Sequence, residues 1–469
     1  MQPPEPHKGP NIGTICRLLD RPPLGDASAA TSREATKTDP AEVILVGASV
    51  RSAAASAKIA GYRVLGIDQF GDTDTRVLCD QFATFDELLD LSLNEFDDWA
   101  SRFRDAIVLQ VGGMTGRGQR ILSRLSGVCQ RLGPTDAQSR ALADPLWLDR
   151  FARGSGIHFP TTVSTRPTTD DGITDAAAPR DGTADGTAAT SIRWLHKRSP
   201  QLTPSSGGLG VRFADNQCEP IPNHPVDEHC NEIWQKWVPG RSFGATFYSD
   251  GDSACFVGLC RSSFHRIKDR PFVYAGSSGP LSLPPRIVDR LNQLGNTIVR
   301  LSQLSGLFGT DIIIDRQERI SLIEINPRWT ASCELIERAI MQQSQTSAGH
   351  ALISVVLRRT NTGEVRNAIR HSPDQSRSML WKRVIYARND AIFRSQWIGE
   401  ILSGVEADIT IADIPNDGHV IRKHEPVFTL MGSYDRDSAD AASLSLRSGI
   451  ETIRRVHATI QRFRLPATS

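Results

Sequence analysis

The chain has 469 residues, of which 39% are hydrophobic and 23% charged, and its formal net charge at pH 7 is +1. This length allows roughly two to four domains, and the near-neutral charge gives no reason to expect nucleic acid or an anionic membrane as a partner. The sequence has no apolar run of about 18 residues, the length that spans a bilayer. Its eight scattered cysteines lack the paired spacing of a zinc or redox motif, so we expect reduced thiols in a cytoplasmic protein.

The N-terminal part of the sequence predicts a disordered leader followed by a Rossmann-like domain. Residues 1–40 are rich in Pro, Ala, Thr and charge and lack an apolar core, which is typical of a disordered segment. Residues 43–46 form an apolar strand that enters a Gly-Ala-Ser turn, a helical stretch and a second strand at 62–67, and a third strand is expected at 106–111. This order is typical of a parallel α/β sheet, which we place at residues 41–160. The G-x-G-x-x-G fingerprint of dinucleotide-binding domains is absent, so NAD is not expected.

The rest of the chain predicts an α+β architecture. Residues 166–190 contain almost no large apolar side chains and are expected to form a disordered insertion. Beyond them, strand-like runs recur at 192–195, 233–238, 244–248, 255–259, 309–314 and 320–325, with a helix at about 285–304. We assign residues 161–345 to this unit and residues 346–469 to a C-terminal α+β segment that completes or caps it.

The strongest local signal is GTDIIIDRQERISLIEINPR, in which two β-branched runs flank a polar turn. We interpret it as an antiparallel hairpin. Pairing Asp315 with Ile320 across the turn would bring Asp311 opposite Glu324, and the alternation of side chains in strands places Asn326 on the same face.

Two facing carboxylates need a compensating cation, because like charges directly opposed in a hairpin are destabilising. Magnesium prefers oxygen ligands and typically takes one or two carboxylates together with substrate phosphates. We therefore predict that Asp311, Glu324 and Asn326 hold Mg²⁺, for which Mn²⁺ could substitute, and that Arg328 places a guanidinium beside it. The alternative is a surface hairpin whose carboxylates are simply solvated.

Two further segments could bind a nucleotide. Lys197 is followed by SSGGLGV at residues 205–211, where glycines would let backbone amides close on phosphate oxygens. WQKWVPGRS at residues 234–242 has an apolar strand that ends at Pro-Gly, as a hinge between lobes does. Taken alone, the first segment is more often just an ordinary turn, and the second is little more than a strand followed by a turn. The spacing of the first segment does not match a P-loop.

The order of these elements resembles the ATP-grasp superfamily, in particular a branch of predicted ATP-dependent carboligases related to biotin carboxylase. The similarity includes VGASVRSAAASAKIAGYRVLGIDQFGDTDT, FVYAGSSGPL, EINPRWTASCELIERA and ADIPNDGHVI. It implies a Rossmann-like pre-ATP-grasp domain followed by a two-lobed ATP-grasp fold that holds ATP between its lobes. The resemblance also implies a role for each segment: Lys197 and Arg328 would contact the phosphates and the acyl phosphate, the loop with Ser206, Gly207, Gly208 and Gly210 would cover the phosphates, and Gln235, Lys236, Trp237 and Val238 would form the adenine hinge.

The function that this resemblance implies is an ATP- and Mg²⁺-dependent ligase that converts a small-molecule carboxylate to an acyl phosphate and transfers it to an amine or, as a second choice, a thiol. Relatives of this branch point to the biosynthesis of one-carbon carrier cofactors, and a homodimer is compatible with the resemblance. Two alternatives stay open. One is a carboligase that activates bicarbonate, and the other is an ATP-binding or interaction protein without catalysis.

Overall fold

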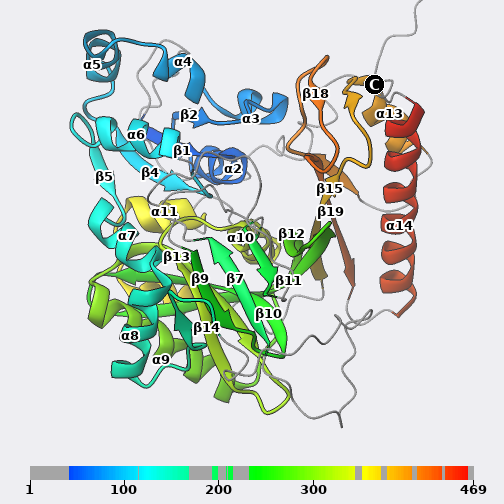
Figure 1. The fold of residues 1–469 in the computed structure, drawn as a ribbon. Helices are drawn as coiled ribbons and strands as arrows, with labels where there is room; N and C mark the ends of the chain where they lie inside the picture. Colours follow the sequence, from blue (N-terminus) through cyan, green and yellow to red (C-terminus); the bar gives the residue numbers. More distant parts are fainter. Residues whose placement is uncertain are drawn as a thin grey trace, which may run out of the picture.

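A computed structural model describes residues 42–114, 116–167, 193–198, 208, 210–214, 232–343, 351–370, 378–403, 409–435 and 439–462. The predicted leader at 1–40 and nearly all of the predicted insertion at 166–190 lie outside these residues. Four sheets make up the described part, and Figure 1 shows the first of them with its helices at the upper left. None of the described helices combines the length and the apolarity that a membrane span requires.

The first sheet is parallel throughout, with strand order β3-β2-β1-β4-β5. The apolar run VILVG of β1 is buried on both faces, as a central parallel strand must be. Val43 and Leu45 pack with the alanines of α2, whereas Ile44 and Val46 pack with α5 and α6, so helices cover both faces. The elements are β1 (Val43–Gly47), α2 (Arg51–Ile59), β2 (Val64–Asp68), α3 (Thr73–Leu78), β3 (Gln81–Thr84), α4 (Phe85–Leu89), α5 (Leu93–Ser101), β4 (Ile107–Val111), α6 (Gly116–Leu125), β5 (Gln130–Leu132), α7 (Asp136–Ala143) and α8 (Pro145–Ser155).

A small antiparallel sheet follows, with strand order β6-β9-β7-β8. Its strands are β6 (Thr162–Val163), β7 (Trp194–Arg198), β8 (Val211–Phe213) and β9 (Glu232–Lys236). The strand expected at 192–195 is therefore shifted toward its C-terminal side in the structure, which places Lys197 inside a strand rather than after one.

The largest sheet has eight strands in the order β14-β13-β10-β11-β12-β15-β19-β17. Neighbouring residues of β10 face opposite sides: Phe247 packs with helix α9, and Tyr248 belongs to the same core as helix α10. The elements are β10 (Arg241–Asp250), β11 (Ala254–Ile267), β12 (Arg270–Gly279), α9 (Pro285–Ser302), β13 (Ser305–Ile314), β14 (Ile320–Asn326), α10 (Ala331–Gln343), α11 (Leu352–Leu357) and α12 (Thr362–Arg370).

The C-terminal segment extends this large sheet, because β15 pairs with β12 and β19 pairs with β15. A separate core forms between these strands and the last helices, with Trp397 and Phe428 fully or almost fully buried in it. The elements are β15 (Ser378–Tyr386), β16 (Ala391–Ile392), α13 (Gln396–Leu402), β17 (Thr410–Ala412), β18 (Val420–Ile421), β19 (Pro426–Asp435) and α14 (Ala439–Arg462). The helix expected at 441–463 is thus present.

The first domain contacts the rest of the chain at two places that matter for the site. At the end of β4, the amide of Gly112 donates to the carbonyl of Trp329 at 3.0 Å. At the start of α3, the amide of Thr73 donates to the carbonyl of Ile414 at 2.8 Å. The segments around Trp329 and Ile414 are therefore both held against the carboxyl ends of the parallel strands, the edge where ligands bind in open α/β sheets.

Candidate active site

The hairpin of β13 and β14 carries the predicted metal ligands. Asp311 is paired with Glu324 in the ladder, and Asn326 lies two residues further along the same strand, so the predicted pairing of these carboxylates is confirmed. The register near the turn is wrong by one residue, because Ile314 rather than Asp315 pairs with Ile320. A β-bulge opposite the step from Asp311 to Ile312 restores the pairing.

Polar side chains converge on this face of the hairpin. Asn326 Nδ2 donates to Asp311 Oδ2 at 3.3 Å, and Arg328 Nη2 donates to Asn326 Oδ1 at 2.9 Å. Arg328 is positioned by a tight turn in which its own amide donates to the carbonyl of Asn326 at 2.8 Å. The guanidinium therefore lies beside the carboxylates, as the sequence predicts.

Electrostatics at Asp311 reflect this crowding. Its side chain keeps access to solvent, yet the surrounding protein desolvates the carboxylate, and this effect together with the charge of Glu324 raises the pKa of Asp311 to about 7. Arg328, Asn326 and Lys197 oppose the shift. The pKa of Asp311 stays raised in spite of Arg328 and Lys197, so the pair of carboxylates would gain from binding a further cation.

The donor set fits magnesium. In the described part of the chain, no group of three or more His, Cys, Asp or Glu side chains could hold a metal by itself. Two carboxylates and an amide oxygen would leave coordination positions for phosphate oxygens, which is the usual arrangement for Mg²⁺. The amide oxygen of Asn326 accepts one hydrogen bond from Arg328 in the structure, and its second lone pair remains for a metal.

Lys197 reaches the same site from the small sheet. Its Nζ donates to Gln235 Oε1 at 2.5 Å, and Gln235 Nε2 donates to Thr162 Oγ1 at 3.1 Å. Desolvation lowers the pKa of Lys197, whereas the charges of Glu324 and Asp311 raise it. The two sheets thus place a lysine within electrostatic reach of the opposed carboxylates, and the buried side chain of Gln235 positions that lysine.

The Gly-rich loop is described only in part. Ser206 and Gly207 lie outside the described residues. Gly208 has a φ of +80°, and a Cβ there would lie 1.9 Å from the carbonyl oxygen of Phe272 in β12, so only glycine fits this contact. Gly210 precedes β8, whose pairing with β7 brings the end of the loop next to Lys197.

The segment predicted as an adenine hinge lies at the end of β9, one of the two inner strands of the small sheet. The amide of Lys236 donates to the carbonyl of Thr161 at 2.9 Å, and the amide of Trp237 donates to the carbonyl of Arg193 at 2.8 Å. These two amides are therefore used within the sheet. Val238 follows the strand. Its amide donates to no carbonyl among the described backbone contacts, so it remains as a donor for the edge of an adenine base.

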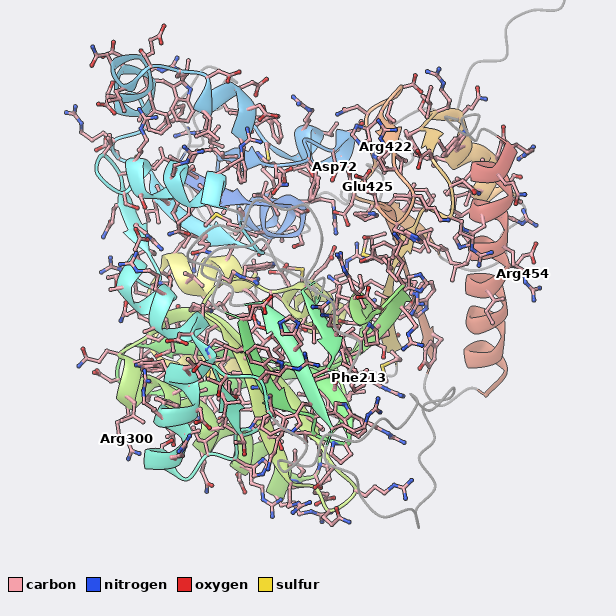
Figure 2. All side chains as sticks on the ribbon, viewed as in Figure 1. Asp72, Phe213, Arg300, Arg422, Glu425 and Arg454 are labelled. Atoms are coloured by element: carbon pink, nitrogen blue, oxygen red, sulfur yellow. The ribbon has the colours of Figure 1, made fainter. Side chains whose placement is uncertain are left out.

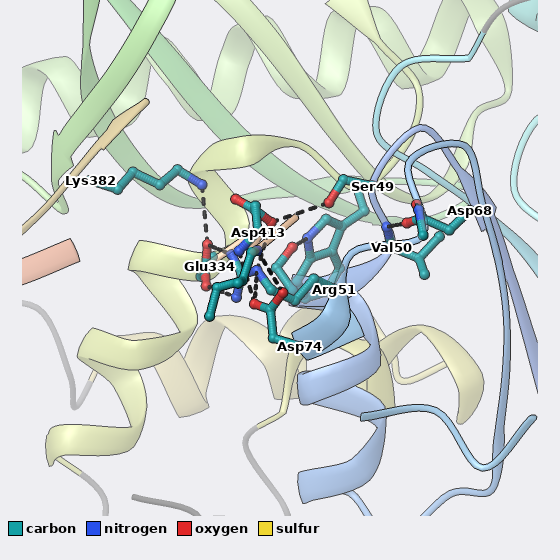
Figure 3. A network of polar contacts seen from close by, with 12 residues as sticks. Ser49, Val50, Arg51, Asp68, Asp74, Glu334, Lys382 and Asp413 are labelled. Atoms are coloured by element: carbon teal, nitrogen blue, oxygen red, sulfur yellow. Dashed lines mark hydrogen bonds and ion pairs between the residues drawn. The ribbon is translucent and has the colours of Figure 1, made fainter. Parts of the chain in front are cut away.

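Sequence reasoning missed a buried ion network beside this site (Figure 3). Arg51 donates from Nη1 and Nη2 to Glu334 at 2.8 and 3.0 Å and from Nε to Asp413 at 2.7 Å. Lys382 Nζ lies 3.3 Å from Glu334, and Asp74 Oδ2 lies 3.7 Å from Arg51 Nε. The sequence contained one signal that could have pointed to this network. Arg51, Glu334 and Asp413 lie in three of the blocks that carry the family resemblance.

Comparison with known proteins agrees with the fold and the hairpin. Residues 201–332 match the family model described as ATP-grasp domain. No curated protein matches the sequence. Three solved structures show the same fold over 87–89% of this chain and 97–99% of their own: an N5-carboxyaminoimidazole ribonucleotide synthetase from Thermotoga maritima (14% identity, TM-score 0.53), an L-amino acid ligase from Bacillus licheniformis (10%, 0.59) and a carboxyaminoimidazole ribonucleotide synthase from Aspergillus clavatus complexed with ATP (12%, 0.58).

These findings identify the class of protein. Residues 201–332 match an ATP-grasp domain, and a parallel-sheet domain lies on the N-terminal side of it. The resemblance to the ATP-grasp superfamily and the fold class predicted from the sequence are confirmed to this extent. At 10–14% identity, the similarity to solved structures concerns the fold alone.

Proposed function

We propose that this protein is an ATP- and Mg²⁺-dependent ligase that joins a small-molecule carboxylate to an amine through an acyl phosphate. The observation that carries the proposal is the pairing of Asp311 with Glu324 next to Asn326, Arg328 and Lys197. Opposed carboxylates with two nearby cations are suited to phosphoryl transfer, in which the protein mainly positions the reactants and stabilises charge.

Each residue has a role in this proposal. Asp311, Glu324 and Asn326 would hold Mg²⁺, which neutralises charge on phosphate oxygens when bound. Lys197 would contact the phosphates, and Gln235 would keep its ammonium group in place. Arg328 would turn from Asn326 to the transferring phosphoryl group, where a planar guanidinium can donate two hydrogen bonds. The loop with Ser206, Gly207, Gly208 and Gly210 would cover the phosphates and exclude water from the acyl phosphate.

The adenine base would lie at the end of β9. Val238 would donate its amide to the adenine edge, and the neighbouring residues Gln235, Lys236 and Trp237 would support it. Lys236 and Trp237 would act through their carbonyl groups, because their amides are already used within the sheet.

The domain boundaries at 160 and 345, a homodimer and a place in the cytoplasm remain predictions from the sequence.

The test is release of ADP by the purified chain with Mg²⁺ and pairs of carboxylates and amines. We expect Glu324→Gln and Asp311→Asn to lose activity by a factor on the order of 100 or more, because each removes a group that stabilises charge in the transition state. Glu318→Gln is the matched control, since Glu318 lies in the turn of the same hairpin and pairs with Arg286 at the surface. Full Mg²⁺-dependent activity in Glu324→Gln would refute the proposal.

The same assay separates the alternatives. Stimulation of ADP release by bicarbonate but not by other carboxylates would indicate a carboligase. ATP binding without ADP release under any substrate pair would indicate a protein without catalysis. A role in the assembly of a one-carbon carrier would require activity with amines of that kind, and it rests on the sequence resemblance.

A further inference from the structure

The contact between α3 of the first domain and the C-terminal segment gathers acidic groups. The carboxylate of Asp74 accepts the amides of Asp413 and Ile414, both at 2.9 Å, and the amide of Thr73 donates to the carbonyl of Ile414. In Figure 2 the labelled residue Asp72 lies where these two parts of the chain meet. The contact is built by the protein's own hydrogen bonds, so its carboxylates are in place without a bound nucleotide.

Negative charge exceeds positive charge here. The carboxylates are Asp68, Asp72, Asp74, Glu334 and Asp413, and the cations that pair with them are Arg51 and Lys382. Most of these carboxylates are fully used. Asp68 accepts three amides at 2.8 Å, and Glu334 accepts both arms of Arg51.

Asp72 is the exception. It is 9% exposed and precedes α3 at the N-cap position, yet its side chain accepts no cap hydrogen bond, and no group in the described part of the chain donates to it. Burial raises its pKa to about 8, together with the charges of Asp413, Asp68 and Asp74, and Arg51 only partly opposes them. The carboxylate oxygens of Asp72 are not fully cut off from solvent, so an incoming cation could reach a group that the described part of the chain leaves without a hydrogen bond.

Asp413 offers a second hydrogen-bond acceptor, and its side chain can be reached from solvent. Its Oδ1 accepts from Arg51 Nε and, at 3.4 Å, from Ser49 Oγ, whereas no described group donates to its Oδ2. The side chain is 27% exposed, so the network is open on this side. Its backbone has a φ of +56°, a strained conformation that the two hydrogen bonds to Asp74 maintain.

Trp329 connects the acidic cluster with the candidate active site. Trp329 follows Arg328, accepts a 3.4 Å hydrogen bond from Arg328 Nη1 through its carbonyl, and donates from its indole to Ser52 Oγ at 3.0 Å. Ser52 is the neighbour of Arg51, which holds Asp413. The cluster is therefore linked, through Ser52 and Trp329, to the arginine that we assign to the acyl phosphate.

We propose that Asp72 and Asp413 receive a positively charged ammonium group of the amine substrate. The identification of this amine as a substrate rests on the proposed function, whereas the cation site itself does not depend on that function. An ammonium group suits this pair, because its hydrogen bonds to two separate carboxylates need no fixed coordination geometry. The amine is thus recognised in its protonated form, and it would give up that proton, to Asp72 or to solvent, before its lone pair attacks the acyl phosphate and phosphate leaves.

The experiment measures binding without ATP. Ligand-observed saturation-transfer NMR on the full chain would compare n-butylammonium chloride with 1-butanol at about pH 8.5, where Asp72 is mostly ionised and the amine still carries its proton. We expect transfer to n-butylammonium alone. Asp72→Asn and Asp413→Asn should weaken binding about tenfold, because each removes a charge-assisted hydrogen bond, whereas Asp97→Asn, an exposed change on α5, should not.

Several outcomes would overturn the inference: equal transfer in the wild type and in Asp72→Asn, equal transfer to 1-butanol, or displacement of the amine by Mg²⁺ at equal concentration. A purely structural role for Asp72 is tested by thermal melting, since it predicts a lower melting temperature for Asp72→Asn, whereas we expect no decrease. Ammonium binding without ADP release from any substrate pair would contradict only the proposed function. ADP release without ammonium binding would contradict only this inference.

Discussion

Replacing Arg51 by methionine should loosen the contact between the first domain and the rest of the chain. Arg51 is 7% exposed and makes hydrogen bonds of 2.7, 2.8 and 3.0 Å to Asp413 and Glu334. Methionine replaces the aliphatic part of the side chain but not the guanidinium, so both carboxylates lose this partner, and Lys382 at 3.3 Å compensates only Glu334. Breaking a buried pair from one side costs about 3–5 kcal/mol, and the lower figure corresponds to about a 150-fold increase in local opening.

Hydrogen exchange at α2 and α10 measures this opening. The amide of Ala54, which donates to the carbonyl of Val50 at 2.9 Å, reports on the first turn of α2. Arg286→Met is the control, because Arg286 pairs with Glu318 on the surface and should leave α2 unchanged. Exchange in Arg51→Met within about threefold of the wild type, less than 1 kcal/mol, would refute the reasoning.

The effect should also depend on pH with a defined sign. Arg51 and Lys382 hold the pKa of Glu334 well below its usual value, against the effect of burial. A carboxyl group whose pKa is lowered by folding stabilises the folded state above its unfolded pKa, about 4.3, and this contribution is lost as the pH falls further. The difference between wild type and Arg51→Met should therefore be complete at neutral pH and shrink below about pH 4.

Three further predictions concern other parts of the molecule. Gln235→Leu removes the acceptor that positions Lys197, so the KM for ATP in the ADP-release assay should rise about tenfold with the fold retained. Gly208→Ala places a Cβ 1.9 Å from a carbonyl oxygen of β12 and should weaken ATP binding in calorimetry, whereas Gly154→Ala, with nothing within 4 Å, should not. Because folding raises the pKa of Asp72 to about 8, the wild type should lose stability as the pH rises from about 4 to 8. Asp72→Asn should therefore melt higher than the wild type at about pH 9 but not at about pH 4.

The candidate metal site could be predicted because its residues lie close together in the sequence. In a hairpin, strand alternation and a short turn decide which side chains face each other, so the pairing of Asp311 with Glu324 follows from local rules. The bulge could not be predicted in this way. The bulge compensated an error of one residue in the expected register. The predicted pairing of Asp311 with Glu324 was therefore right, although the predicted pairing nearest the turn was wrong.

The ion network could not be predicted, because its residues are far apart in the chain. Arg51 and Glu334 are 283 positions apart, and Arg51 and Asp413 are 362 apart. No periodicity or spacing connects such residues; only the packing of α2 against α10 and the C-terminal segment brings them together. The unpaired state of Asp72 is equally a property of the assembled fold.

The same packing connects stability with chemistry at this site. Helix α10 begins three residues after Arg328 and carries Glu334 on its first turns, so the bond from Arg51 to Glu334 fixes the start of the helix relative to the first domain. Trp329, between them, is held from both sides by Gly112 and Ser52. The backbone that carries the Arg328 side chain is held by this connection, so it cannot shift without opening the domain contact. Arg51→Met should therefore lower kcat for ADP release more than it raises the KM for ATP, because the nucleotide contacts from Lys197 lie on the other sheet.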